Sequence, residues 1–308
     1  MINVLENIPL SSYTTLGIGG PAKYFVEARS VEELKEASTF AKEKSLEILT
    51  ISGGSNLLVN DPGFPGLVIK LDLTGIKLSG ETVVASAGST LNELVDFANN
   101  NSLAGAEKLA GIPGSIGGAV YGNAGAYGQT VSDKLVGVNI LQDGEVKSLS
   151  KEECAFEYRD SGFKRMKNTI ILEAEFRFGK GDSEELIKVS VETIEKRKEK
   201  YKPGIKTPGS FFKNVLIENL PVDMQKDMPK DYYGKVPAWW FLEQVGAKDA
   251  RLGQVHIADF HANLFVNEGN GTAKDFFDLA KEYKEKVKEK FGIDLEPEVQ
   301  LIGFQEEM

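Results

Sequence analysis

Residues 110–128 read AGIPGSIGGAVYGNAGAYG and say more about the fold than any other stretch of the chain. Glycine dominates this run, and none of its residues is charged. Glycine loses more conformational freedom on folding than any other residue, so dense runs persist where the backbone needs positive φ or approaches a ligand closely. A flexible linker would be polar, whereas this run contains Ile112, Ile116, Val120 and Tyr127. We therefore predict a packed loop that faces a ligand.

A second glycine turn, SGGSN at residues 52–56, lies at the end of a predicted strand. The preceding residues predict a strand at 22–28, a helix that begins with a capping box of Ser30 and Glu33, and a second strand at 46–51. Ligands of open α/β sheets bind at the carboxyl ends of strands. Two adjacent glycines also let successive amides point into one concavity, which suits a pyrophosphate. An ordinary connecting turn is the alternative for this turn alone, but the other glycine run favours one large nucleotide-type cofactor.

Further elements follow from hydrophobic periodicity and from capping residues. The interval 57–88 predicts short strands of one mixed sheet, and Thr90 with Glu93 predicts a helix over 91–99. Pro203 and Pro208 predict a domain boundary. The remaining predictions are strands at 134–148 and 169–178, a helix over 184–200 with Leu186, Val189 and Ile194 inward, a surface insertion at 216–236, a helix from Thr272 to Gly292 and a last strand over 293–304.

The composition limits the classes of function. A chain of 308 residues with 41% hydrophobic content is long enough for roughly two or three domains. Its net charge of −10 argues against a nucleic-acid or anionic-membrane surface. The single cysteine, Cys154, excludes an internal disulfide, fits a reduced cytosolic setting and is expected to be a buried apolar residue. Neither histidine has a metal-ligand spacing, so we expect no metal site. No segment resembles a signal peptide or a membrane span.

Three polar positions are candidates for chemistry, and each has a plain structural alternative. Arg159, in FEYRDS, could clamp a carboxylate, although such arginines more often form surface ion pairs. Ser210, in GSFFKN, offers a hydroxyl near a lysine and an amide, and turn chemistry is its alternative. Glu298 follows a proline, so its alternative is an exposed carboxylate on an edge strand. The cysteine and the two histidines give no convincing nucleophile–base set, so a hydrolytic nucleophile is not expected.

Several motifs occur together in an order that resembles the UDP-N-acetylenolpyruvoylglucosamine reductases, the flavoenzymes that complete UDP-N-acetylmuramate for bacterial peptidoglycan. The resemblance runs from about residue 11 to residue 303, and the ordered set is far more specific than any single motif. The motifs are TLGIGGPA (15–22), SGGSN (52–56), the glycine run 111–128, YRDS (158–161), GSFFKN (209–214) and LEPEV (295–299).

The resemblance implies an α+β fold: a two-domain FAD-binding part of the vanillyl-alcohol-oxidase type and a C-terminal α+β substrate domain. The expected bounds are 1–69 with 292–308 for the first flavin subdomain, 70–199 for the second and 200–291 for the substrate domain. FAD is expected along both glycine loops. The implied FAD-binding residues are Ser52, Gly53, Gly54, Ser55, Asn56, Gly111, Ile112, Pro113, Gly114, Ser115, Gly117 and Gly118.

The resemblance also implies the reaction. NADPH reduces FAD and leaves, and the enolpyruvyl ether then occupies the same site and is reduced, with carbanion character developing beside its carboxylate. Arg159 and Glu298 match the residues that stabilise this centre, for which Glu298 must be protonated. Ser210 matches the residue that protonates the carbanion. The positions that match substrate-holding residues are Tyr127, Lys200, Asn214 and His261.

The chain departs from the family pattern at three places, and two alternatives compete with this resemblance. Val215 stands where proline is usual, and Trp239-Trp240 replaces the usual Gly-Trp pair. One branch of the family has a loop whose Tyr closes over the nucleotide, and residues 172–197 of this chain contain no clear counterpart of it. An oxidase with covalently attached FAD commonly needs His or Cys in the flavin loops, where this chain has neither. A flavin-binding protein without catalysis is hard to reconcile with the matches at the three reactive positions. We expect a cytoplasmic monomer that takes a small-molecule substrate and binds neither nucleic acid nor membrane.

Overall fold

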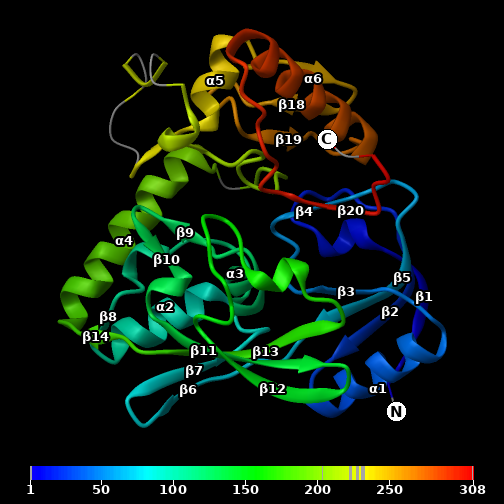
Figure 1. The fold of residues 1–308 in the computed structure, drawn as a ribbon, viewed down its shortest axis with the longest axis vertical. Helices are drawn as coiled ribbons and strands as arrows, with labels where there is room; N and C mark the ends of the chain where they lie inside the picture. The colour runs from blue at the N-terminus through cyan, green and yellow to red at the C-terminus, as the bar shows by residue number, and fades with distance from the viewer. Residues whose placement is uncertain (1, 203, 222–223, 227–228, 230–232, 307) are drawn as a thin grey trace. The chain divides into compact units, whose positions relative to one another are not determined.

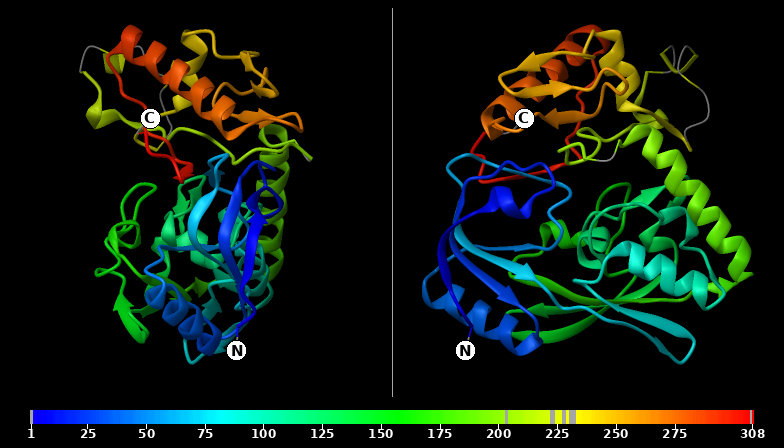
Figure 2. Two further views of the ribbon diagram at one scale, coloured as in Figure 1. Left: turned by 90° about the vertical axis from the view of Figure 1, so that its right-hand side faces the viewer. Right: turned by 180° about the vertical axis from the view of Figure 1, so that it is seen from behind.

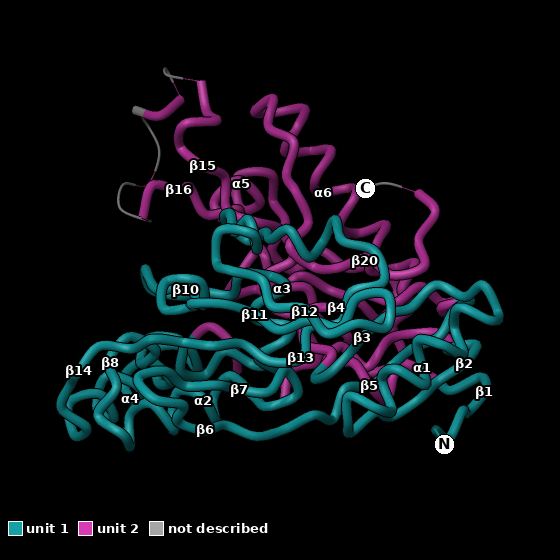
Figure 3. Tube along the Cα trace, turned by 60° about the horizontal axis from the view of Figure 1, so that its bottom comes forward, with its two compact units in different colours: residues 1–8, 22–53, 65–199 teal, residues 9–21, 54–64, 200–308 magenta. Residues whose placement is uncertain are grey.

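The computed structural model describes residues 2–202, 204–221, 224–226, 229, 233–306 and 308. The chain divides into two compact units, which Figure 3 shows in different colours. Each unit has its own hydrophobic core. Unit 1 comprises Met1–Ile8, Ala22–Gly53 and Pro65–Glu199, and unit 2 comprises Pro9–Pro21, Gly54–Phe64 and Lys200–Met308.

Unit 1 contains a four-stranded sheet in the order β1-β2-β5-β3 (Figure 1). The predicted strand–helix–strand succession is present, with β5 inserted between β2 and β3 and parallel to β3. Ser30 Oγ caps the helix by accepting from the Glu33 amide at 3.2 Å. The Glu33 carboxylate accepts from the Arg29 amide at 2.6 Å, so the predicted reciprocal bond to Ser30 is wrong by one residue. The elements are β1 (Leu5–Pro9), β2 (Pro21–Ala28), α1 (Val31–Glu43), β3 (Ile48–Ile51) and β5 (Phe64–Leu71).

A second sheet of unit 1 has five antiparallel strands in the order β12-β11-β13-β7-β6. The predicted strand over 134–148 is split in two, because Asp143 and Gly144 take φ values of 52° and 85° and reverse the chain in a tight turn. The strands are β6 (Ile76–Ser79), β7 (Thr82–Ser86), β11 (Leu135–Gln142), β12 (Glu145–Ser150) and β13 (Thr169–Phe176).

The prediction of one mixed sheet over 57–88 is wrong. Strand β4 (Leu57–Val59) pairs in parallel with β20 (Gln300–Ile302), whereas β5 lies in the four-stranded sheet and β6 and β7 in the five-stranded one. Short apolar runs separated by glycine and proline indicate strands, but they carry no information about which partner each strand takes.

Helices α2 (Leu91–Asn100) and α3 (Ile116–Tyr121) pack against the five-stranded sheet (Figure 1, Figure 2). Thr90 and Glu93 form the predicted capping box of α2. Helix α4 (Ser183–Lys200) confirms the prediction over 184–200. Its buried positions include Leu186 and Ser190, whereas Val189 and Ile194, which were predicted to point inward, are half-buried.

The core of unit 1 joins both sheets and their helices. Leu67 of the four-stranded sheet, Ile140 of the five-stranded sheet and Leu94 of α2 are all buried in it. Cys154 is buried in the same core, as expected, and burial raises the pKa of its thiol to about 11. Two short ladders complete the unit, β8 (Leu103–Ala104) with β14 (Gly179–Lys180) and β9 (Gly125–Ala126) with β10 (Gln129–Thr130).

Unit 2 packs a small antiparallel sheet and two helices around a core rich in phenylalanine. The helix predicted from Thr272 is confirmed, because Thr272 Oγ1 accepts from the Asp275 amide at 3.0 Å and Gly292 ends the helix with a φ of 70°. The fully buried phenylalanines are Phe211, Phe212, Phe241, Phe265 and Phe276. The elements are β15 (Val215–Leu216), β16 (Lys235–Val236), α5 (Ala238–Gln244), β17 (Arg251–Leu252), β18 (Val255–Ile257), β19 (Phe265–Asn267) and α6 (Ala273–Phe291).

The predicted strand over 293–304 is confirmed only at β20. Upstream of β20 the chain pairs with the segment that carries Ser210. The Lys213 amide donates to the Glu296 carbonyl at 2.8 Å, and the Glu298 amide donates to the Phe211 carbonyl at 2.7 Å. Pro297 lies between these two bonds, at a position that needs no N–H.

Parts of the predicted insertion at 216–236 lie outside the described residues, as does Pro203. Near its two ends β15 pairs with β16, and Leu220 is buried, so the insertion is anchored to the core of unit 2. Within the described part of the chain, no helix is long and apolar enough to cross a membrane. The short 3-10 helices are Leu10–Tyr13, Glu107–Leu109, Val131–Asp133, Gly162–Arg165, Ile217–Asn219 and Met224–Lys226.

Candidate functional site

The first glycine turn directly follows β3. Gly54 has a φ of 58°, and a Cβ at this position would overlap the carbonyl oxygen of Tyr13. The Thr15 amide also donates to the Gly54 carbonyl at 3.1 Å. Because the backbone conformation and the close approach both exclude a side chain, only glycine fits here without moving the neighbouring backbone.

Gly53 faces the second glycine run within unit 1. A Cβ on Gly53 would lie 3.4 Å from the Gly114 Cα, and nothing else beyond its chain neighbours approaches within 4 Å. In the described part of the chain, the Gly53 amide donates to no protein acceptor. The two loops therefore bring bare backbone and an available N–H group together.

The second run leads into α3, whose first amides are already paired. The Ile116 amide donates to the Ser89 carbonyl and the Gly117 amide to the Ala87 carbonyl, both at 2.8 Å. Ser115 Oγ accepts from the Gly118 amide at 3.2 Å. Because these donors are used within the protein, a hydrogen bond from this run to a ligand would come from the loop before α3.

Two residues that the sequence did not single out hold that loop in place. Gly111 has a φ of 75°, and its amide donates to Asn92 Oδ1 of α2 at 2.8 Å. Its carbonyl accepts from Arg197 Nε of α4 at 3.0 Å. The loop is thus fixed from two helices that pack on it, which is the rigidity that a cofactor-binding loop requires.

These observations fit FAD. A pyrophosphate needs N–H donors and a backbone without side chains in the way, and the Gly53 and Gly114 segments supply this arrangement within unit 1. The adjoining turn residues, Ser52 and Ser55, add hydroxyl groups beside the same backbone.

Replacing Gly53 with alanine should weaken flavin binding without unfolding the protein. Gly53 does not have a positive φ, and its added Cβ would meet only the Gly114 Cα at ordinary contact distance. The methyl group would instead occupy the space where a pyrophosphate approaches the backbone. We expect the purified variant to lose most of its flavin absorbance and to keep the far-UV circular dichroism of the parent. Full flavin content in this variant would show that the pyrophosphate does not lie at Gly53.

Arg159 lies in a tight turn of unit 1 and contacts the hairpin that carries Tyr127. Its φ is 53°, and Lys164 Nζ donates to its carbonyl at 2.8 Å, which holds the turn. The guanidinium Nη2 donates to the Gly125 carbonyl at 2.7 Å, in strand β9. Tyr127 follows this strand with a φ of 49° and an exposed side chain. The structure therefore brings Arg159 and the Tyr127 hairpin together, with Lys164 as a further positioning residue.

Ser210 lies in unit 2 with two polar partners on its hydroxyl. Lys200 Nζ donates to Ser210 Oγ at 3.3 Å, and the Tyr201 hydroxyl lies 3.2 Å from the same oxygen. The Phe211 amide donates to the Asn263 carbonyl at 3.0 Å, which fixes the backbone beside Ser210. The Ser210 hydroxyl therefore contacts an ammonium group and a phenol, so its surroundings are not those of a serine that only stabilises a turn.

Glu298 and Asn56 are tied to the same segment of unit 2. The Glu298 amide bonds to the Phe211 carbonyl, one residue from Ser210, and Asn56 Nδ2 donates to the Glu298 carbonyl at 3.1 Å. The Glu298 side chain is half-buried, so the alternative of a fully exposed edge carboxylate is wrong. Ser210 and Glu298 lie far apart in the sequence. The pairing of residues 211–213 with 296–298 brings their backbone segments together.

His261 and Asn214 have different surroundings within unit 2. Burial, and after it the nearby Lys200 ammonium, lower the pKa of His261 to about 3. Its Nδ1 accepts from the Asn263 amide at 3.2 Å, as a neutral imidazole can. Asn214 Oδ1 accepts from the Ala238 amide at 3.2 Å and so caps the start of α5. Trp240 of α5 packs edge-on against Phe241, which identifies this part of the unusual tryptophan pair as a core contact.

His261 should make the folded protein sensitive to acid. Its pKa is depressed to about 3 from 6.5, so the stability it contributes is present above pH 6.5 and is lost as the pH falls toward 3. Each proton bound only by the unfolded state costs about 1.4 kcal/mol per pH unit. In urea unfolding between pH 7 and pH 4, the stability of His261→Asn should therefore fall less steeply than that of the parent. Equal slopes would show that His261 is protonated in the folded state.

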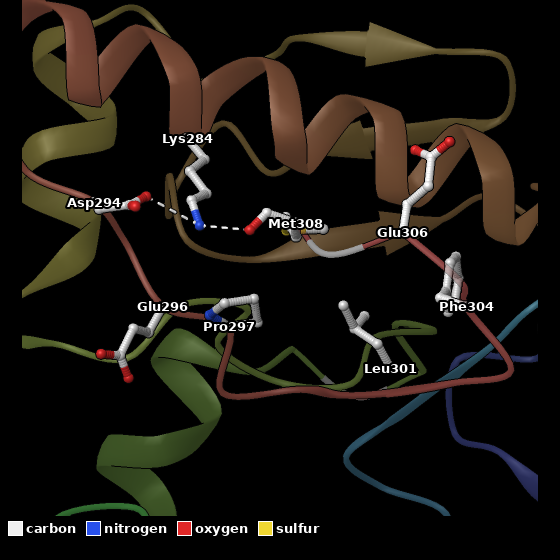
Figure 4. Close-up of a pocket in the computed structure, with 8 residues that line it drawn as sticks. All are labelled: Lys284, Asp294, Glu296, Pro297, Leu301, Phe304, Glu306 and Met308. Carbon is white, nitrogen blue, oxygen red and sulfur yellow. Dashed lines mark hydrogen bonds and ion pairs between the residues drawn. The ribbon is translucent and has the colours of Figure 1, made fainter.

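A pocket of about 460 Å³ opens elsewhere in unit 2 (Figure 4). Lys284 Nζ in this pocket pairs with Asp294 at 3.0 Å and donates to the Met308 carbonyl at 2.7 Å. Glu296 and Glu306 add further carboxylates to the lining. Among the lining residues the only cation, Lys284, is already paired, and the other charged side chains are carboxylates, so the pocket is unsuited to a pyrophosphate or a UDP-sugar. None of the predicted site residues lines this pocket.

Two models of known protein families match this chain and indicate its class. Residues 22–150 match the model of an FAD-binding domain, and residues 200–302 match that of the UDP-N-acetylenolpyruvoylglucosamine reductase C-terminal domain. Together with the glycine loops and the Ser210 cluster, these matches define an FAD-dependent oxidoreductase with a separate C-terminal domain.

The full-length similarities define the family. The chain is 44% identical over 302 residues to a UDP-N-acetylenolpyruvoylglucosamine reductase of Solibacter usitatus, with 97% of each chain covered. It is 35% identical to that of Bacillus subtilis over 97% of this chain and 94% of the relative. A solved reductase from Thermus caldophilus superposes with a TM-score of 0.77 at 30% identity, covering 98% of this chain and 99% of that one. The chain belongs to the UDP-N-acetylenolpyruvoylglucosamine reductase family.

This membership confirms the larger predictions from the sequence. The α+β flavin fold, the oxidoreductase activity in peptidoglycan synthesis and the use of FAD and NADPH are all confirmed. The individual site residues and the domain bounds stay predictions.

Proposed function

We propose that this enzyme reduces the enolpyruvyl ether of UDP-N-acetylglucosamine to UDP-N-acetylmuramate, and that Ser210, Arg159 and Glu298 carry the substrate half of the reaction. The observation that carries this assignment is the Ser210 hydroxyl, held by Lys200 and Tyr201 on the backbone segment that also pairs with Glu298. Bound FAD supplies the transfer of two electrons from NADPH to the vinyl group. The chain's own residues must manage the charge that this transfer creates.

The difficulty of the reaction is the negative charge that develops beside a carboxylate. Arg159 is a permanent cation whose turn is fixed by Lys164, so it can stabilise that charge without reorganising. Glu298, when protonated, donates a hydrogen bond to the same centre. Ser210 gives its hydroxyl proton to the carbanion carbon and completes the reduction.

The remaining assignments concern substrate binding and organisation. Tyr127, Lys200, Asn214 and His261 hold the substrate, and the neutral His261 does so as a hydrogen-bonding rather than a charged group. The flavin subdomains span 1–69 with 292–308 and 70–199, and the substrate domain spans 200–291. The enzyme works in the cytoplasm, which the single cysteine supports because the chain can form no internal disulfide, and it works as a monomer.

An anaerobic colour test separates this function from its two alternatives. The purified protein should be yellow, should bleach with NADPH, and should regain its colour when UDP-N-acetylglucosamine enolpyruvate is added. Flavin that stays with the chain after denaturation would indicate a covalent oxidase. Bleaching without recovery by the substrate, or no bleaching at all, would overturn the proposal in favour of a different reductase or a flavin-binding protein.

A further inference from the structure

Ser210 has a second acid within reach, which the sequence did not single out. The Tyr201 hydroxyl lies 3.2 Å from Ser210 Oγ, and Lys200 Nζ lies 3.3 Å from the same atom. We propose that Tyr201 supplies the proton that replaces the one Ser210 gives to the substrate, and that Lys200 stabilises the resulting phenolate. This proposal rests on the assignment of Ser210 as the proton donor.

The chemistry requires such a partner. An aliphatic hydroxyl is a weak acid, so a serine that protonates carbon without a second donor is left as an alkoxide. A phenol is a stronger acid than an aliphatic alcohol, and its anion is stabilised by a neighbouring cation. Proton transfer from Tyr201 to Ser210 as the carbon–hydrogen bond forms therefore avoids the alkoxide.

The packing of unit 2 holds the Tyr201 and Ser210 hydroxyls close together. The Tyr201 ring packs with Ile205 and Phe260 against a small core that includes Leu264. Ser210 forms an antiparallel bridge with the same Leu264. Ser210 is thus paired with a residue of the same small core against which Tyr201 packs, so this core holds both side chains.

Lys200 fits the role of a stabilising cation. An ammonium group only donates, so its bond to Ser210 Oγ occupies an acceptor site and leaves the serine proton free to be given away. Its Nζ also lies 5.0 Å from the centre of the Tyr201 ring, where it stabilises negative charge on the phenol.

The proton count of the proposed step balances. The carbanion carbon takes the Ser210 proton and forms the new carbon–hydrogen bond, Ser210 Oγ takes the Tyr201 proton, and the Tyr201 phenolate later takes one proton from water. No group is oxidised or reduced in this relay, because the electrons have already reached the substrate carbon.

Tyr201→Phe is the sharpest test, because it removes one oxygen and keeps the packed ring. In single-turnover experiments we expect reoxidation of the pre-reduced enzyme by saturating substrate to slow by about 10- to 100-fold. Flavin content, the rate of bleaching by NADPH and the substrate dissociation constant should not change. The solvent deuterium isotope effect on reoxidation should increase, since proton delivery becomes limiting, and a purely structural role would not produce this increase. Ile205→Val, which alters the same packing but no hydroxyl, should behave like the parent.

A double variant separates the relay from the assignment on which it rests. If Tyr201 acts only through Ser210, adding Tyr201→Phe to Ser210→Ala should slow reoxidation no further. Additive losses, or a Tyr201→Phe variant with normal reoxidation while Ser210→Ala is slow, would overturn the relay and leave Ser210 as the donor. Normal reoxidation in Ser210→Ala itself would overturn the proposed proton donor and the relay together.

Discussion

Replacing Ser210 with alanine is expected to slow the substrate half of the reaction by about 10²- to 10⁴-fold, the usual contribution of a positioned general acid. Bleaching of the flavin by NADPH should keep its normal rate, because that half requires no proton at carbon. The substitution removes only the hydroxyl, and the backbone is held independently. The Phe212 amide donates to Asn263 Oδ1 at 2.9 Å, and Asn263 Nδ2 donates to the Phe212 carbonyl at 2.8 Å.

Stopped-flow absorbance of the flavin measures the two halves separately. The reduced variant is mixed with UDP-N-acetylglucosamine enolpyruvate, and the return of the yellow colour is timed against that of the parent. Ser210→Cys is the matched control, because it keeps a proton on the γ-atom and should recover part of the rate. A comparable loss in both halves, or equal behaviour of the alanine and cysteine variants, would count against Ser210 as the proton donor.

Local features of the sequence predicted much of the fold and the two glycine loops. Thr90 and Thr272 cap helices where their spacing to Glu93 and Asp275 predicts. The glycine turn at Gly53 and Gly54 is recognisable because glycine is the residue that tolerates both positive φ and close approach. Such signals depend on residues that are neighbours in the chain, so one sequence is sufficient to find them.

The features that were missed depend on pairings between distant residues. Nothing in the local sequence indicates that 57–59 pairs with 300–302, or that 296–298 pairs with the segment beside Ser210. Arg197 lies in a charged helix, and the periodicity of that helix does not indicate that its side chain donates to the Gly111 carbonyl. The local sequence does not indicate the role of Tyr201 either, since its contact with Ser210 appears only once Tyr201 packs against the small core that includes Leu264. The local sequence therefore indicates which chemistry a side chain can perform, but it does not indicate which distant residue the side chain contacts.

Among single glycine-to-alanine substitutions in the two glycine loops, Gly54→Ala should destabilise the folded protein most. Gly54 needs a φ of 58°, and an added Cβ would overlap the Tyr13 carbonyl oxygen. A positive φ alone costs an alanine about 1–2 kcal/mol. The overlap adds to this cost because the obstructing atom is backbone, and the neighbouring Thr15 amide is hydrogen-bonded to Gly54 itself at 3.1 Å, so the two segments cannot separate without losing that bond. We expect a total loss of about 3 kcal/mol or more, the range that a clash with fixed structure typically produces.

Gly80→Ala is the matched control for this prediction. Gly80 has a nearly identical φ of 62°, but nothing lies within 4 Å of an added Cβ. Its loss of stability should therefore report the backbone cost alone, about 1–2 kcal/mol, and its flavin content should be normal. Urea unfolding gives the two stabilities, and flavin absorbance per protein gives the two cofactor contents. Equal losses at both positions would mean that the Tyr13 segment moves aside freely, and the close packing at Gly54 would then not be what fixes the cofactor turn.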